Sequence, residues 1–205
     1  MSAAAAAGER PRPGRPSSGA RERILDGALE VLKRDGYAGL TTAKVAAASG
    51  QSKALIAYHF GSKQGLVTAV AHQVSETIVA DVLEAIGEPA SANELVRGLT
   101  AGIWRLVDRD PGLQRVYFDL ASQSVIDPEV ERIMTEMKQR FRGILATLLA
   151  EVRDGPPPER VEGAAVYLIA GVEGLSLERL DRGDTPELRS AREMFERSAS
   201  AAISG

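Results

Sequence analysis

The sequence contains no cysteine and only two histidines among its 205 residues. Without thiols the chain cannot form a disulfide, a Cys-ligated zinc or iron–sulfur site, or a cysteine nucleophile. Neither His59 nor His72 has a second histidine at helical spacing. Phosphate-binding Gly-rich loops, Gly-x-Ser-x-Gly elbows and His-Glu-x-x-His motifs are also absent. These absences argue against an enzyme, and we expect no metal and no cofactor.

Long apolar runs are missing as well. No stretch approaches the roughly 20 apolar residues of a membrane span, and the first residues lack the apolar core of a secretion signal. We therefore expect no membrane association and a cytoplasmic location, which suits a chain without cysteine. With 44% hydrophobic and 26% charged residues, the chain can bury the core of one or two compact domains.

Charge is spread unevenly along the chain. Residues 1–65 hold ten Lys/Arg and five Asp/Glu, whereas residues 66–205 hold fifteen and twenty-three. No acidic residue occurs between Asp35 and Glu76, a segment that carries Lys44, Lys53 and Lys63. A polyanion can approach such a segment without repulsion. A solvated surface that lacks acids by chance is the alternative, and charge alone does not separate the two.

The N-terminal part predicts a basic arm followed by three helices. Residues 1–18 combine an alanine run with arginines and prolines, a composition that predicts a disordered arm. Apolar residues then recur at helical spacing, and glycine or hydroxyl residues mark the ends of the helices. The expected helices cover 21–36, 41–50 and 52–60. Two short helices joined by a tight glycine turn form a helix-turn-helix, and we place this domain at residues 19–65.

The remainder, residues 66–205, predicts longer helices and no strands. Ser62 caps a helix that continues to about Ile86, and Ser91 with Glu94 forms a capping-box signature. Asp127-Pro128 and Thr185-Pro186 have the cap-then-proline order of helix starts, and three consecutive prolines end a helix near residue 156. The expected helices are 63–86, 91–107, 111–122, 128–153, 159–180 and 186–203. The fold class is therefore all-α.

The segment from Arg21 to Val70 resembles the DNA-binding domain of the TetR family of bacterial transcriptional regulators. Several separate features follow one another at the family's spacing. They are Ile24-Leu25, Ala28, Gly36-Tyr37, Thr41-Thr42, Val45-Ala46, Gly50, Ser52-Lys53, His59-Phe60, Ser62-Lys63 and Leu66. Further along, Glu173-Gly174-Leu175 is similar to an acidic-Gly-Leu element of the family's penultimate helix.

The resemblance implies contacts with operator DNA. We carry the family's DNA contacts over to the matching positions of this chain and add neighbours at the same helix starts. The expected DNA-binding residues are Thr42, Lys44, Gln51, Ser52, Lys53, Ala54, Tyr58, His59 and Lys63. The chain has Ile56-Ala57 where the family usually has Leu-Tyr, so Tyr58 is the candidate to replace that phosphate contact. Lys53 can read guanine or contact a phosphate, and His59 and Tyr58 can instead pack against the domain core. Arg12 and Arg15 of the arm are candidates for the minor groove or for unspecific polyanion binding.

The resemblance also implies that the C-terminal domain binds a small molecule and forms a homodimer through the last two helices. Large side chains of the central helices are the candidates for the ligand pocket: Trp104, Tyr117, Phe118, Met134, Met137, Phe141 and Tyr167. No cluster of charges marks a charged ligand, which favours an apolar or mixed one. The apolar and glycine stripe of the penultimate helix is the candidate dimer interface: Ala164, Leu168, Gly171, Val172 and Leu175.

The function expected from these observations is sequence-specific regulation of transcription. The partners would be a pseudo-palindromic double-stranded DNA operator, a second copy of the chain and an unknown small organic effector, with the protein acting as a repressor that the effector releases. An effector-independent DNA-binding regulator of the nucleoid type, or an activator with the same fold, is the alternative.

Overall fold

The computed structural model describes residues 18–204 and is all-α within that range. The basic arm expected before Ser18, with Arg12 and Arg15, lies outside the described residues. The helices are α1 (Ser18–Gly39), α2 (Thr42–Ser49), α3 (Lys53–Phe60), α4 (Lys63–Ile86), α5 (Ala92–Arg109), α6 (Pro111–Gln123), α7 (Pro128–Glu151), α8 (Val161–Arg182) and α9 (Pro186–Ile203), with a 3-10 turn at Pro158–Arg160.

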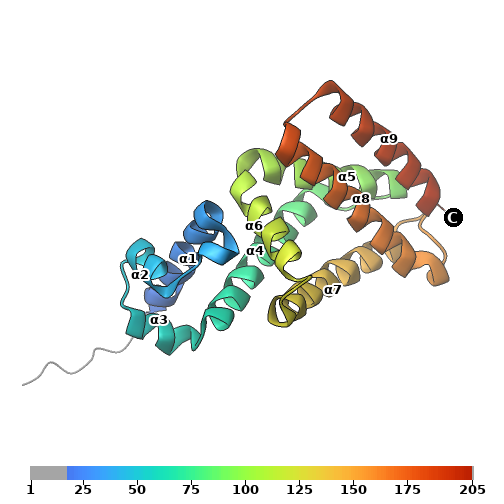
Figure 1. Ribbon diagram of the computed structural model, residues 1–205. Helices are drawn as coiled ribbons and strands as arrows, with labels where there is room; N and C mark the ends of the chain where they lie inside the picture. Colours follow the sequence, from blue (N-terminus) through green and yellow to red (C-terminus); the bar gives the residue numbers. More distant parts are fainter. Residues whose placement is uncertain (1–17, 205) are drawn as a thin grey trace, which may run out of the picture.

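Helices α1, α2 and α3 form a small N-terminal domain at one end of the molecule, and α5 to α9 form the larger domain at the other (Figure 1). Helix α4 runs between them and belongs to both. Its first apolar residues, Leu66, Val67 and Val70, are buried with the helix-turn-helix, and later ones such as Val82 are buried against α5. The two domains therefore share one continuous hydrophobic core.

Helix α4 is long and apolar enough, by length and composition alone, to cross a membrane. This differs from the expectation that no stretch would pass that test. In the fold its apolar residues, including Val74 and Ile78, are buried inside the protein, so α4 is the core helix of a globular arrangement.

Helix α5 lies unusually close to α4 because it has glycines where the two helices touch. A Cβ atom added to Gly102 would stand 2.8 Å from the Cα of Val82, and one added to Gly98 would stand 2.6 Å from the Cα of Ile86. Both glycines lie on the same face of α5, four residues apart. The absence of side chains there lets the backbones of the two helices approach.

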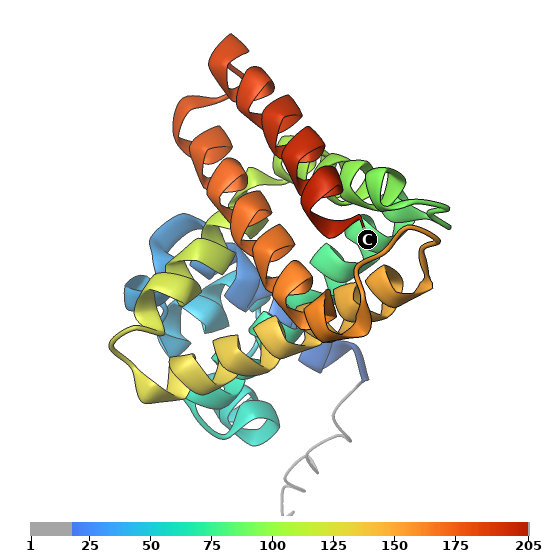
Figure 2. The ribbon, with the colours of Figure 1, turned by 90° about the vertical axis from the view of Figure 1, so that its right-hand side faces the viewer.

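Helices α8 and α9 run side by side and antiparallel on one face of the larger domain (Figure 2). Gly183, with a φ of 74°, ends α8, and the Thr185 hydroxyl caps α9 by accepting from the Leu188 N–H at 3.2 Å. Close packing of the pair depends on Gly171, because an added Cβ there would fall on the Phe195 ring.

Candidate DNA interface and effector cavity

The start of helix α3 is capped and exposed. The Ser52 hydroxyl accepts from the Leu55 N–H at 3.1 Å, and Gly50 takes the left-handed conformation, with a φ of 66°, that turns the chain from α2 into α3. The side chain of Ile56 is buried and fixes α3 on the domain core, while Lys53 and Ala54 face solvent. The helix-turn-helix thus presents the N-terminal part of α3, the part that reads base edges in this motif.

The expected DNA-binding residues fall into two groups. Thr42, Ser52, Lys53, Ala54 and Tyr58 are exposed, and Tyr58 has 72% of its side-chain surface free. Lys44 is exposed as well, but together with Gln51, His59 and Lys63 it makes contacts within the protein.

Lys44 forms an ion pair with Asp35 at 2.9 Å, and the Gln51 amide donates to the Ser49 carbonyl at 3.4 Å. His59 is half-buried, and its buried Nε2 has no hydrogen-bond partner within residues 18–204.

Lys63 lies where the starts of α2 and α4 meet. Thr42 at the start of α2, and Ser62 and Lys63 at the start of α4, line one depression. The Ser62 hydroxyl caps α4 by accepting from the Gly65 N–H at 3.0 Å. The Lys63 ammonium donates to the Tyr37 carbonyl at 3.2 Å and lies over the Tyr37 ring, 4.5 Å from its centre. Two helix N-termini and a lysine in one depression create a positive potential that attracts anions.

A polar junction joins α1 to the larger domain. Gly36 interrupts α1 with a φ of 68° and a ψ of 179°, a conformation reserved for glycine. This break directs the Tyr37 N–H to the Asp119 carboxylate of α6 at 2.5 Å and the Tyr37 hydroxyl to Asp127 at 2.9 Å. Burial, with the Asp127 hydrogen bond, raises the pKa of Tyr37 to about 12.

The sequence predicts Gly36 as a helix end and Gly36-Tyr37 as a feature of the family resemblance, but it does not predict this junction. The signal that was available is the Gly36-Tyr37 pair itself, because a glycine followed by an aromatic residue indicates a special backbone position next to a buried ring. The partners Asp119 and Asp127 are distant in sequence, and no local pattern indicates them.

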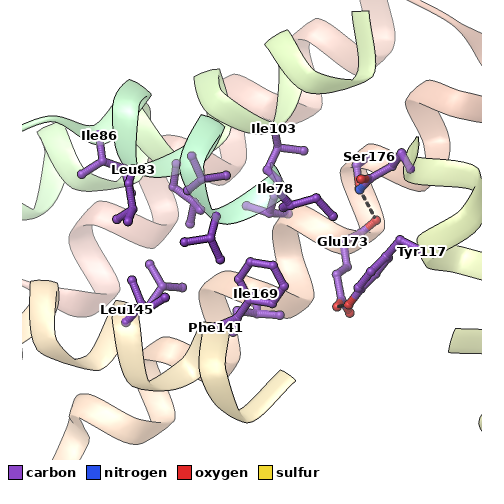
Figure 3. Close-up of a pocket in the computed structure, with 16 residues that line it drawn as sticks. Ile78, Leu83, Ile86, Ile103, Tyr117, Phe141, Leu145, Ile169, Glu173 and Ser176 are labelled. Carbon is purple, nitrogen blue, oxygen red and sulfur yellow. Dashed lines mark hydrogen bonds between the residues drawn. The ribbon is translucent and has the colours of Figure 1, made fainter. Parts of the chain in front are cut away.

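A cavity that is open on one side lies between α4, α5, α6, α7 and α8 (Figure 3). Its lining is apolar apart from one end, where Tyr117 and Glu173 lie together; Leu83, Ile86 and Leu145 lie at the opposite end. The Tyr117 hydroxyl donates to the Glu173 carboxylate. Burial raises the pKa of Tyr117, and the charge of Glu173 acts in the same direction, so the hydroxyl keeps its proton.

Only Tyr117 and Phe141 of the expected ligand residues line this cavity. Trp104, Met134 and Met137 are buried in the core, and Phe118 packs against it. Tyr167 is exposed on α8 beside a separate shallow depression. Large side chains at helical spacing mark core and cavity alike. The polar lining residues Gln114, Glu173 and Ser176 were missed as ligand candidates: Glu173 was noted only as part of the Glu173-Gly174-Leu175 element, and no sequence pattern marks Gln114 or Ser176.

The structure corrects the expected dimer stripe. Leu168 and Val172 are buried within the same chain, and they are therefore unavailable to a second copy. Ala164 and Leu175 are partly buried and pack against the same core, and Gly171 touches Phe195 of α9. The periodicity identified the face of α8 that packs inside the protomer. The opposite face of the α8–α9 pair carries the exposed apolar side chains Val166, Tyr167, Leu177 and Met194.

Comparison with known proteins agrees with this geometry. Residues 24–70 match the model of bacterial regulatory proteins of the tetR family, and residues 92–204 match the model of the C-terminal domain of BetI-type transcriptional repressors. The chain is 28% identical over 179 residues to the nucleoid occlusion factor SlmA of Vibrio vulnificus, covering 83% of this chain and 88% of SlmA.

Among solved structures, a TetR-family transcriptional regulator from Rhodococcus sp. superposes with a TM-score of 0.79 at 20% identity, covering 91% of this chain and 100% of that one. A transcriptional regulator from Saccharomonospora viridis, solved in complex with choline, superposes with a TM-score of 0.74 at 19% identity over 92% of this chain and 100% of that one. The matched models together span both domains, and they are models of DNA-binding regulators rather than enzymes. The chain belongs to the TetR family of bacterial transcriptional regulators.

Proposed function

We propose that this protein is a cytoplasmic repressor that binds a pseudo-palindromic operator as a homodimer and leaves it when a small organic molecule occupies the cavity. The observation that carries this proposal is the course of helix α4. The helix begins beside the helix-turn-helix at Lys63, and its far half, from Ile78 to Ile86, lines the cavity. A ligand that changes the position of α4 changes the position of the DNA-binding domain.

The base-reading surface in this proposal is the start of α3. Lys53 and Ala54 are exposed there, and Gln51 becomes available once its weak amide contact with Ser49 is exchanged for a base. Side chains of these types recognise guanine or adenine edges in the major groove, and each good bidentate contact discriminates by about 1–3 kcal/mol.

Phosphate contacts would flank this surface. Thr42 lies at the start of α2, Lys63 retains donors beyond the one given to the Tyr37 carbonyl, and Tyr58 is exposed on α3. Such contacts fix the register of the protein on the duplex without reading sequence. His59 and Lys44 stay engaged in the domain and have a supporting role.

The dimer surface in this proposal is the exposed face of α8 and α9. Val166, Tyr167 and Leu177 of α8 and Met194 of α9 expose apolar surface. The exposed glycines Gly163 and Gly174, with open space around them, would let a second α8 approach closely. A two-fold dimer places two recognition helices about one DNA turn apart, roughly 34 Å, or at a larger multiple.

Effector release requires a ligand that binds one arrangement of the dimer better than the other. A ligand that prefers a half-site separation unsuited to DNA lowers operator affinity, typically by a factor of about 5 to 150. The choline complex of the structural neighbour from Saccharomonospora viridis supports a small organic molecule as ligand in this fold.

The test begins with selection of bound sequences from a randomised DNA pool by the purified protein, with light scattering to give its mass. A two-fold symmetric consensus bound by a dimer is expected. Titration of the selected operator is then repeated with each compound that raises the melting temperature in a metabolite screen. A monomer, a consensus without symmetry, or tight ligands that never alter operator affinity would contradict the proposal.

Lys63→Ala tests the phosphate contact. Loss of one phosphate contact per subunit weakens binding to all sequences alike and lowers the slope of log affinity against log salt by about 0.9 per contact. The matched control is Arg153→Ala, which removes an exposed cation just after α7. An unchanged slope for Lys63→Ala, or an equal change for Arg153→Ala, would remove Lys63 from the interface.

A second candidate function is effector-independent DNA binding of the nucleoid type. The similarity to the nucleoid occlusion factor SlmA of Vibrio vulnificus favours it. The cavity distinguishes the two functions: the effector-independent protein would bind its operator with the same affinity whether or not the cavity is filled.

A further inference from the structure

The polar end of the cavity has a negative charge that the protein does not neutralise. Glu173 of α8 is half-buried, and its carboxylate accepts from the Tyr117 hydroxyl. Glu173 forms no salt bridge with any Lys, Arg or His of residues 18–204. Arg142 of α7 is near enough to act on the charge state of Tyr117, yet it does not pair with Glu173. A carboxylate in a mostly apolar cavity is stabilised by a cation that enters with its own charge.

A second polar group at the same end also lacks a partner. Gln114 of α6 is 3% exposed, and its Nε2 donates to the Ser176 Oγ at 3.3 Å. The Ser176 hydroxyl gives its own proton to the Glu173 carbonyl at 3.0 Å, so it can only accept from Gln114, which fixes the orientation of the amide. Gln114 is one of the residues that line the cavity, and its Oε1 atom is buried without a hydrogen-bond partner among residues 18–204. This acceptor requires a donor.

The opposite end of the cavity offers only hydrocarbon. Leu83, Ile86 and Leu145 lie there, and Phe141 lines the cavity from α7 (Figure 3). Apolar side chains of α4 and α7 form this end of the cavity. A ligand that uses the whole cavity therefore carries an apolar body as well as a charge.

We propose that the effector is an organic monocation with at least one N–H donor on its charged nitrogen and an apolar body: a protonated amine, bound with its nitrogen between Glu173 and Gln114. This inference rests on the proposed function only in assuming that the cavity receives the effector. It narrows the expectation of an apolar or mixed ligand, because one carboxylate, rather than a cluster of charges, selects the charge of the ligand.

The test is calorimetric titration of the full chain, without DNA, with four compounds that share one eight-carbon chain. Octylammonium is expected to bind most tightly. Octyltrimethylammonium keeps the charge but has no N–H for Gln114, 1-octanol has a donor but no charge, and octanoate brings the wrong charge; each should bind at least tenfold more weakly. Shortening the chain from octyl- to butylammonium should weaken binding about fourfold per CH₂.

Variants assign the preference to the two residues. Glu173→Gln should make octylammonium and 1-octanol bind alike, while Glu162→Gln, an exposed position near the start of the same helix, should leave the order unchanged. Gln114→Leu should remove the advantage of octylammonium over octyltrimethylammonium and keep its advantage over 1-octanol. Circular dichroism melts check that each variant is folded.

The outcomes separate this inference from the proposed function. If octanoate or 1-octanol binds as tightly as octylammonium, or if no compound of the series binds at millimolar concentration, the amine assignment is overturned, and other ligands can still control the operator. If octylammonium binds in the expected order but leaves operator affinity unchanged, the assignment stands and the proposed effector control fails.

Discussion

Replacing Gly102 by alanine should separate helix α5 from helix α4. The new Cβ would stand 2.8 Å from the Cα of Val82 and 3.0 Å from the Cβ of Ala85, whereas ordinary contacts of a Cβ atom lie at 3.4–4 Å. One neighbour is backbone and cannot rotate away, so the helices must move apart by several tenths of an ångström or more. Overpacking of this kind costs about 1–3 kcal/mol.

The matched control is Gly143→Ala on α7. Gly143 is exposed, and a Cβ there meets no neighbouring atom of the described part of the chain within 4 Å. Both substitutions gain the same helix propensity, about 1 kcal/mol. The difference between their free energies of unfolding therefore isolates the contact with α4. We expect Gly143→Ala to be more stable than the wild type and Gly102→Ala to be less stable than Gly143→Ala by about 1–3 kcal/mol.

Urea denaturation at one fixed protein concentration measures both variants, and thermal melts should show about 2–4 °C per kcal/mol for a chain of this size. Because α4 lines the cavity, Gly102→Ala should also alter the affinity of any cavity ligand, which Gly143→Ala should not. Equal stability of the two variants would refute the close approach of α4 and α5.

Three further expectations concern the junction and the dimer. The pKa of Asp127 is lowered in the folded protein, first by the hydrogen bond from the Tyr37 hydroxyl. Ionised Asp127 therefore stabilises the fold above its unfolded pKa of about 3.9, and this stabilisation is lost as the pH falls through the folded pKa. Denaturation of Asp127→Asn across that pH range should lack this loss of stability. Gly36→Ala should lower the free energy of unfolding by about 1–3 kcal/mol, because the positive φ at Gly36 strains any residue with a side chain. Leu177→Arg should yield monomers in light scattering, whereas Val125→Arg, at a still more exposed apolar position on the loop before α7, should not.

The helix boundaries could be read from the sequence because their causes are local. Ser52, Ser62 and Thr185 cap helices at the expected positions, and Gly50 ends α2 as expected. Caps and left-handed glycines act within one turn of the chain, so the sequence nearby contains the whole signal. The break in α1 is different: the helix is interrupted at Gly36, but a turn of three more residues continues to Gly39.

The cavity could be predicted only in outline because it depends on contacts between distant segments. The apolar stripe of α8 indicated which face of that helix is buried. It could not distinguish burial against a second copy from burial within the protomer, and the structure buries Leu168 within the protomer. The pairing of Tyr117 with Glu173 joins residues 56 positions apart. An apolar residue such as Met134 follows the same helical spacing whether it fills a core or borders a cavity, and the spacing cannot distinguish the two.

Helix α4 leaves no linker between the two domains, and this limits how such proteins can be recombined. The match to the tetR family model ends at residue 70, inside α4, and the helix continues unbroken to Ile86. A chimaera that joins this DNA-binding domain to another effector domain must therefore be spliced within a rigid rod, where each inserted residue turns everything downstream by about 100° and advances it by about 1.5 Å. Only splices that keep the helical register should place the two recognition helices of a dimer on one face of the DNA.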